Sequence, residues 1–288
     1  MRVDFVNLVW YNLYMYNHKE ISNRLATAID CALKKVDDDI LRLLKEAYAN
    51  EDNPRAKWAL AQIIENDEIA LAHNCYPCQD TGVAMLFVTV GQNATFDGSL
   101  ENALTEGVRL GYADARKSIA HPLTRINTGD NTPAVIYYDV VDGDGLTVDF
   151  LAKGAGSENT SCVKMLTPSK GADGIVSAVC DIVKQAGANP CPPLLLGVGV
   201  GGTMDKACLL SKKALLRKCG QYSADTEVAK LEKRILDEIN ALGIGAQGLG
   251  GKHTALACAV EIAPTHIGML PVAVTIQCHS ARHTKVRF

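Results

Sequence analysis

The sequence lacks the long apolar runs and the excess of one charge that characterise membrane-spanning and nucleic-acid-binding proteins. No stretch of its 288 residues reaches the roughly 18 unbroken apolar positions that a spanning helix needs. Its 29 Lys and Arg nearly balance 32 Asp and Glu, so the formal net charge is −3 and no overall field attracts a polyanion. We therefore expect neither a membrane nor a nucleic acid among its partners.

Targeting and linker signals are also missing. Asn7 and Asn12 interrupt the apolar and aromatic run over residues 5–16, and no small-residue cleavage site follows it, so the run is a poor signal peptide. Residues 1–20 match no motif, and no repeat or low-complexity tract divides the rest. Ten cysteines in such a chain are typical of reduced thiols or metal ligands, because the cytosol keeps thiols reduced. We expect a cytoplasmic protein.

The composition is that of a folded protein, with 48% hydrophobic and 21% charged residues. Apolar residues at steps of three and four predict one or two helices over 21–49 and another helix over 55–72. We therefore expect residues 1–75 to form a helical N-terminal section. No linker follows it, so we expect this section to belong to the same domain as the rest of the chain.

Strand and helix patterns alternate over residues 76–288. Runs rich in β-branched and aromatic residues predict strands at 83–90, 134–141, 146–152 and 194–200. Helical patterns lie at 100–117, 174–186, 205–217 and 226–242. The sequence Asp-Gly-Asp-Gly predicts a hairpin between the second and third strands. The expected fold class is α/β, a mixed sheet with packed helices behind the helical N-terminal section.

Cys75 and Cys78 form a C-x-x-C pair in a polar turn. A structural zinc site would need a second such pair, which the sequence lacks. A thioredoxin-like dithiol should follow a strand and open a helix, whereas here a helical pattern precedes the pair and a strand follows it. Both uses are disfavoured but stay open. Cys78 is followed by Gln-Asp-Thr-Gly, a setting typical of a ligand and not of a core residue.

Glycine-rich turns lie at the ends of several predicted strands. Two of them satisfy G-x-G-x-x-G, but neither has the second strand with an acidic end that a dinucleotide site requires, so nucleotide binding is disfavoured. The glycines either permit tight turns or offer backbone N–H groups to a small carboxylate. Because mixed α/β folds build sites from loops at strand ends, we expect several of these turns to share one pocket.

Six motifs in order resemble a known family. They are CQDTG at 78–82, NTG at 127–129, KGAGSEN at 153–159, NPCPPLLLGVGVGGT at 189–203, LGIGAQGLGGKHTALA at 242–257 and PTHIGMLPVAVTIQCHSARH at 264–283. Together they resemble the alpha subunit of class I, iron-sulfur-dependent fumarate hydratase and its close relative, the alpha subunit of L-tartrate dehydratase. The resemblance covers roughly residues 20–288.

The resemblance implies a [4Fe-4S] cluster held by Cys78, Cys191 and Cys278, with one iron left free to bind substrate. Residues 76–288 would then be the cluster-binding catalytic body. Local pattern agrees, because each of the three lies in a turn or at a strand end. The other cysteines divide into five on helical patterns, where free cysteine is usually core filler, and two undecided ones: Cys31, Cys180, Cys208, Cys219 and Cys258, then Cys75 and Cys162.

Substrate residues are also implied by the resemblance. They are Gln79, Asp80, Arg116, the Gly156 backbone and His266, with Asp80 handling the proton of the leaving hydroxyl and His266 as a second catalytic group. Simpler roles stay open, since Asp80 could cap a turn and His266 could be structural. Lys117 or Arg125 could replace Arg116. Lys252, on a pattern that opens a helix, indicates an anion or an interface and is included as substrate-binding.

Single-chain members of the family continue into a second half that carries further carboxylate anchors and a base, whereas this sequence stops ten residues after Cys278. The resemblance therefore implies an alpha subunit that needs a separate beta subunit, in an oligomer acting on a C4 dicarboxylate. We expect reversible hydration of fumarate to L-malate. The alternatives are an L-tartrate dehydratase alpha subunit and a non-catalytic metal-binding module built on the C-x-x-C pair.

Overall fold

The N-terminal section is helical in the computed structural model, which describes residues 15–288. After the short strand β1 (Met15–Tyr16) come α1 (His18–Lys34), α2 (Asp38–Asn50) and α3 (Pro54–Ala72). The helical pattern over residues 21–49 therefore corresponds to two helices, because the backbone is extended at Lys35 and Asp37. Asn17 and Asn53 accept backbone N–H bonds as the N-caps of α1 and α3. The apolar run at 5–16 lies largely outside the described residues.

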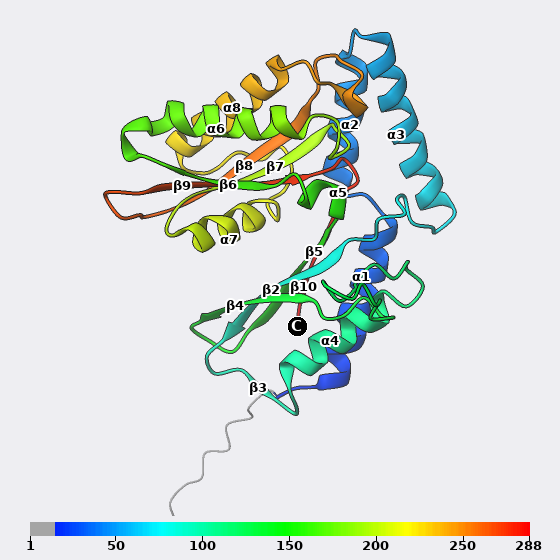
Figure 1. Ribbon diagram of the computed structural model, residues 1–288. Helices are drawn as coiled ribbons and strands as arrows, with labels where there is room; N and C mark the ends of the chain where they lie inside the picture. The colour runs from blue at the N-terminus through cyan, green and yellow to red at the C-terminus, as the bar shows by residue number, and fades with distance from the viewer. Residues whose placement is uncertain (1–14) are drawn as a thin grey trace, which may run out of the picture.

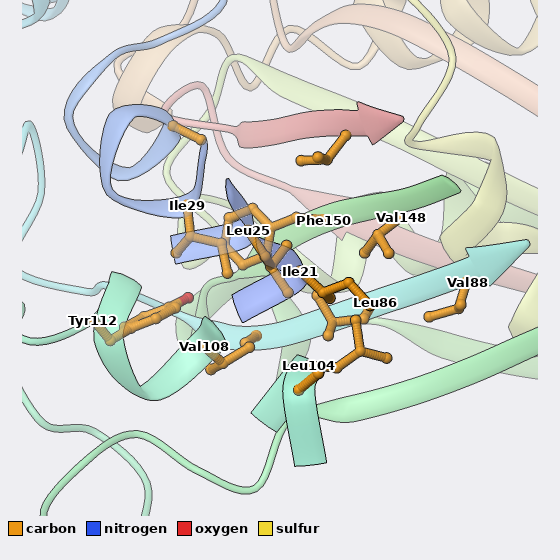
Figure 2. Packing of buried hydrophobic residues seen from close by; sticks show 14 of the residues in the cluster. Ile21, Leu25, Ile29, Leu86, Val88, Leu104, Val108, Tyr112, Val148 and Phe150 are labelled. Carbon is orange, nitrogen blue, oxygen red and sulfur yellow. The ribbon is translucent and has the colours of Figure 1, made fainter. Parts of the chain in front are cut away.

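The first sheet combines three strands from residues 83–153 with the C-terminal strand. Its order is β10-β5-β2-β4, formed by β2 (Val83–Gly91), β4 (Val135–Val141), β5 (Leu146–Lys153) and β10 (Arg282–Arg287). Helices α1 and α4 (Leu100–Gly111) pack on it, and β3 (Thr95–Phe96) pairs with β1 beside them. Figure 2 shows the core between these helices and the sheet, including Ile21, Leu25, Ile29, Leu86, Leu104, Val108 and Phe150.

The predicted hairpin between the second and third strands is wrong. Strand β2 lies between β4 and β5, parallel to the first and antiparallel to the second. The Asp-Gly-Asp-Gly loop instead crosses the end of β2, where the Gly91 N–H donates to the Gly145 carbonyl at 2.8 Å. Most of β2 is buried. In the central position both faces of this apolar strand are covered and both of its edges are hydrogen-bonded, whereas direct pairing of β4 with β5 would have left β2 at an edge of the sheet.

The second sheet has the order β6-β9-β7-β8. Its strands are β6 (Cys162–Leu166), β7 (Leu194–Gly201), β8 (Ala255–Ala263) and β9 (Leu270–Gln277). In Figure 1, α6 (Gly171–Ala186) and α8 (Thr226–Ala241) cover one face of this sheet and α7 (Met204–Ala214) covers the other. Three short turns complete the elements: α5 (Ala155–Glu158) and the 3₁₀ turns Pro168–Lys170 and Ala246–Gly248.

Three expectations are corrected by this second sheet. Lys252 does not open a helix, because the chain runs through a bend into strand β8. Two cysteines expected on helices lie elsewhere: Cys258 is on β8 and Cys219 is in the turn after α7, and both are buried. The run Ala255–Ala263 is apolar on both faces, and such a pattern does not by itself distinguish a buried strand from a helix.

A third cluster of buried side chains joins the two sheets. It packs α2 and α3 against Met85 and Phe87 of the first sheet and against Leu195 and Leu256 of the second. In Figure 1, α2 and α3 lie beside the second sheet, and the end of α3 reaches down towards the first. The α/β fold class is confirmed, as two four-stranded mixed sheets beside an N-terminal helical section. The boundary of that section at residue 75 stays a prediction.

The glycines of β7 serve the packing of α7. A Cβ added to Gly199 would lie 2.0 Å from the Ala207 carbonyl oxygen and 2.6 Å from the Ser211 nitrogen, so the helix backbone occupies the place of a side chain. A Cβ on Gly197 would similarly lie 2.1 Å from the Ser211 carbonyl oxygen. These two glycines permit close approach of a helix, which is neither the tight turn nor the carboxylate site that the sequence pattern left open.

We expect Gly199→Ala to destabilise the protein by about 1–3 kcal/mol, because the methyl group would displace α7. Urea unfolding measures the effect. Gly145→Ala is the matched control, since a Cβ there meets nothing within 4 Å. Equal unfolding midpoints for the two variants would contradict the prediction.

Candidate functional site

Three loops bring Cys78, Cys191 and Cys278 to one region. Cys78 lies between α3 and β2, Cys191 directly before β7, and Cys278 directly after β9. Strands β7 and β9 are antiparallel neighbours with Leu195 opposite Gln277, so two of the cysteines lie at the same end of the second sheet. Burial raises the pKa of Cys278 to about 11, and the charges of Cys78 and Cys191 act in the same direction. The three thiols are therefore within electrostatic range of one another.

Cys191 has an uncommon backbone conformation. Its φ of 56° lies in the left-handed region, which side chains other than Gly and Asn rarely adopt. The Cys191 N–H donates to the Ala188 carbonyl at 3.0 Å, and the next carbonyl, of Pro192, accepts bonds from the backbone and the side chain of Gln247. This turn leaves Cys191 exposed. Backbone strain of this kind is concentrated at functional sites.

Asp80 joins the turn of Cys78 to the turn that follows β5. One carboxylate oxygen accepts the Gly82 N–H at 3.0 Å and the other accepts the Ala155 N–H at 2.7 Å, while the Asp80 N–H points to the Cys78 sulfur at 3.4 Å. Asp80 therefore does cap turns, as the simpler reading held. It also lies next to the cysteine site, so the geometry is compatible with its proposed proton role as well.

Two buried cations lie next to these turns. The sequence indicated no role for either of them. Lys153 is 2% exposed, donates to the Ser157 hydroxyl at 2.7 Å and lies 3.4 Å from Glu158. Burial lowers its pKa to about 8, against the opposing charge of Glu158. Arg282 is 1% exposed and donates to the Asp80 carbonyl at 2.6 Å. Both residues lie within the six motifs quoted above, and that position is the sequence signal by which they could have been identified.

Several residues next to Cys278 in the sequence have buried polar atoms without partners. These atoms are Gln277 Oε1, His279 Nδ1, Ser280 Oγ and Arg282 Nε and Nη1. Burial lowers the pKa of His279 to about 4, so the imidazole is neutral. Native proteins leave few buried polar groups unpaired, and such a concentration indicates a place for a further polar group. Within residues 15–288, no three His, Cys, Asp or Glu side chains are close enough to hold a single metal ion.

Three thiols within electrostatic range of one another are nevertheless compatible with a four-iron cluster. A cubane is larger than one ion and its cysteine ligands lie further apart, so three thiols within electrostatic range suit a cluster better than a zinc ion. The same result gives the Cys75–Cys78 pair no third ligand among the described residues. Thiolates are the usual ligands of iron-sulfur clusters, so this donor set is compatible with one.

Gln79, Gly156 and Arg116 lie on turns around this region. Gln79 is exposed next to Cys78, and a Cβ on Gly156 would lie 3.6 Å from the Asn189 carbonyl oxygen, beside the Cys191 turn. The Arg116 carbonyl accepts the Thr81 hydroxyl at 2.9 Å, which places this residue next to the CQDTG turn. Their roles as substrate ligands stay predictions.

Helix α4 ends at Gly111 and not at residue 117 as predicted, because the chain turns at Tyr112 and Lys117 folds back on the helix end. The Lys117 ammonium donates to the Tyr112 carbonyl at 2.5 Å and to the Ala113 carbonyl at 2.6 Å. This arrangement satisfies carbonyls at the helix C-terminus. Lys117 is therefore engaged and unsuited to replace Arg116, whereas Arg125 is exposed in the following loop.

His266 lies away from the cysteines in this chain, whereas Lys252 is in the loop before β8, at the end of the sheet where Cys191 precedes β7. Lys252 is 58% exposed at its side chain and pairs with Asp52 before α3. His266 is exposed in the loop between β8 and β9, where its Nδ1 accepts the Gly268 N–H at 3.1 Å. It precedes β9 and Cys278 follows β9, so an eight-residue strand of about 25 Å separates them. Whether either residue contacts substrate stays a prediction.

Comparison with known proteins decides the family. Residues 22–287 match the protein family described as "Fumarate hydratase (Fumerase)". The chain belongs to this family. The family of hydro-lyases that the six motifs indicated is thus confirmed.

Three relatives carry the name of another reaction. A protein of Methanocaldococcus jannaschii named "Putative L(+)-tartrate dehydratase subunit alpha" is 43% identical over 254 residues, 85% of this chain and 89% of the relative. "L(+)-tartrate dehydratase subunit alpha" of Escherichia coli strain UTI89 is 32% identical over 259 residues, 88% and 86% of the two chains. The protein of the same name from Shigella sonnei is 32% identical over 254 residues, 86% and 84%.

Two further observations bear on the setting of this family member. Within residues 15–288, none of the helices combines the length and the apolar character needed to cross a bilayer. All ten cysteines are free thiols, so the three cysteines of the site are available as ligands.

Proposed function

We propose that the chain is the alpha subunit of a [4Fe-4S] hydro-lyase that interconverts fumarate and L-malate together with a separate beta subunit. The supporting observation is the convergence of Cys78, Cys191 and Cys278 from three loops, beside buried and unpaired polar atoms. These three thiolates would hold the cluster. When bound, the cluster supplies a Lewis-acidic iron that can polarise the hydroxyl of a 2-hydroxy acid.

The chain's own residues would bind the substrate and move one proton. Dehydration of malate takes a proton from C3 and releases the C2 hydroxyl as water, with a double bond formed between the two carbons. Asp80, held by two backbone N–H groups, would donate the proton that the leaving hydroxyl needs. Gln79, Arg116 and the Gly156 N–H would orient the carboxylates, and the beta subunit would supply the group that takes the C3 proton.

The names of the relatives favour a second substrate, L-tartrate. It shares a 2-hydroxy-dicarboxylate core with malate, so the same residues would serve. The deciding assay supplies the beta partner under strict exclusion of oxygen and offers fumarate, malate and both tartrates. We expect fumarate and malate to give the highest kcat/KM. A preference for L-tartrate would support the second candidate, and no turnover of any of them would support a non-catalytic metal-binding module.

We also propose a cytoplasmic location, on the basis of ten free thiols. Lys252 would belong to an anion site or a subunit interface, because its side chain is exposed and pairs with Asp52.

His266 would serve the site of a neighbouring copy in an oligomer, because about 25 Å of β9 separates it from Cys278 of its own chain. We expect His266→Ala and Asp80→Asn each to inactivate the enzyme. Random re-association of equal amounts of the two variants should recover about a quarter of wild-type activity, because about half of the dimers are mixed and each mixed dimer has one of its two sites intact. Full activity of His266→Ala alone, or no recovery on mixing, would contradict this arrangement.

A further inference from the structure

Arg282 is the largest side chain that the described fold buries completely. It opens strand β10 opposite Ala152 of β5, so its backbone is fixed by the first sheet. One terminal nitrogen donates to the Asp80 carbonyl at 2.6 Å, while Nε and Nη1 are buried without a partner. Burying a permanently charged group costs several kcal/mol unless it is compensated. A neighbouring group must therefore supply that compensation.

Asp67 is an acidic group that acts on Arg282 electrostatically; burial raises the pKa of its carboxyl to about 7, and the charge of Arg282 opposes that rise. Asp67 lies on α3, is 7% exposed, and both of its carboxylate oxygens are buried without a hydrogen-bond partner. Asp67 and Arg282 interact electrostatically, although no hydrogen bond joins them. Two buried groups of opposite charge within such range compensate each other, and loss of either leaves the other uncompensated.

The side-chain hydrogen bond of Arg282 connects the turn of Cys278 to the turn of Cys78. Arg282 is four residues after Cys278, and the carbonyl that it holds belongs to Asp80, two residues after Cys78. The Asp80 carboxylate takes no part, because it accepts the N–H groups of Gly82 and Ala155. Arg282 thus acts on the position of the Cys78 turn and not on the groups proposed to bind substrate.

We propose that Arg282, compensated by Asp67, is a positioning residue that holds the Cys78 turn against the Cys278 turn at the spacing a cluster needs. The inference rests on the proposed function, since the property that Arg282 controls is retention of the cluster. It concerns residues with no assigned part in binding iron or substrate.

The first experiment measures iron loss. The full chain and its variants are reconstituted anaerobically with iron and sulfide, and release of iron to a chelator is followed. Arg282→Met should lose iron about 10–100-fold faster than wild type, as expected when a group that orients ligands is removed. Arg282→Lys should fall between the two. Arg287→Met is the matched control, because Arg287 is exposed on the same strand, and should behave as wild type.

Asp67 is tested by coupling. Asp67→Asn should accelerate iron loss in the wild-type background and have little further effect in Arg282→Met, since interacting residues are not additive. The adjacent exposed Glu68→Gln is its control. Additive effects would overturn the pairing with Asp67, and iron loss from Arg282→Met within twofold of wild type would overturn the role of Arg282.

A second readout needs no cluster. In the iron-free chain, the alkylation rate of the Cys278 thiolate should be about tenfold faster in Arg282→Met, because its turn is no longer held. The rate is normalised to the thiolate fraction from its pH profile, since the charge of Arg282 also lowers the pKa of this thiol. The buried Cys258 should react at an unchanged rate and so report an intact fold. Unchanged Cys278 labelling overturns the inference. Failure of the wild-type chain to take up iron would count against the proposed function instead. If Arg282→Met does not fold, Arg282→Lys and Asp67→Asn carry both measurements.

Discussion

Cys278→Ser is expected to lose the cluster. After anaerobic reconstitution the wild-type chain should contain about four irons and four sulfides, and the variant should bind them at least about tenfold more weakly. A serine oxygen is a poor substitute for the soft thiolate that iron-sulfur clusters prefer. Cys278 is half-buried, and desolvation raises the pKa of its thiol to about 11. Iron and sulfide analysis together with the visible absorption spectrum measures the effect.

The same result is expected for Cys78→Ser and Cys191→Ser. Cys75→Ser is the matched control, since Cys75 shares the turn with Cys78 but is exposed and has no place in the proposed ligand set. Unaltered iron content in Cys191→Ser and Cys278→Ser would show that the cluster is held elsewhere or absent. Iron loss in Cys75→Ser alone would instead favour a site built on the C-x-x-C pair.

Asp80→Asn should lower kcat by about 10²–10⁴-fold in the complex with the beta subunit, the usual contribution of a general acid or base. The amide cannot donate a proton to a leaving hydroxyl at neutral pH. It can still accept one of the two N–H bonds that Gly82 and Ala155 make to the carboxylate, so the turn should persist. Steady-state kinetics with malate gives kcat and KM separately.

The control for Asp80→Asn is a measurement of whether its cluster is intact. Iron content and visible spectrum should match wild type, which would separate a chemical role from a loss of ligand geometry. Asp114→Asn, at an exposed position after α4, should leave kcat unchanged. A kcat of Asp80→Asn close to wild type, with the cluster intact, would reduce Asp80 to the turn cap that its hydrogen bonds also describe.

Local patterns in the sequence predicted the positions of most helices and strands correctly, but they did not predict which strands pair. Helices α1–α3 and strands β2, β4, β5 and β7 follow from the spacing of apolar residues, which is a property of neighbouring positions. Strand β8 was missed because its apolar run has no period. The position of β2 between β4 and β5 depends on contacts between distant segments, so the intervening turn sequence did not reveal it.

The sequence by itself determined the family, through six motifs in a fixed order, and with it the three cysteines as implied ligands. Only the tertiary structure decided which charged side chains are buried near these cysteines. It also decided that His266, a predicted site residue, lies far from Cys278. Arg282 and Asp67 belong to different ends of the chain, and His266 is nearer to Cys278 in sequence than Cys78 is. An extended strand separates residues close in sequence, whereas packing of sheets and helices brings distant ones together, because burial rewards contact irrespective of chain order.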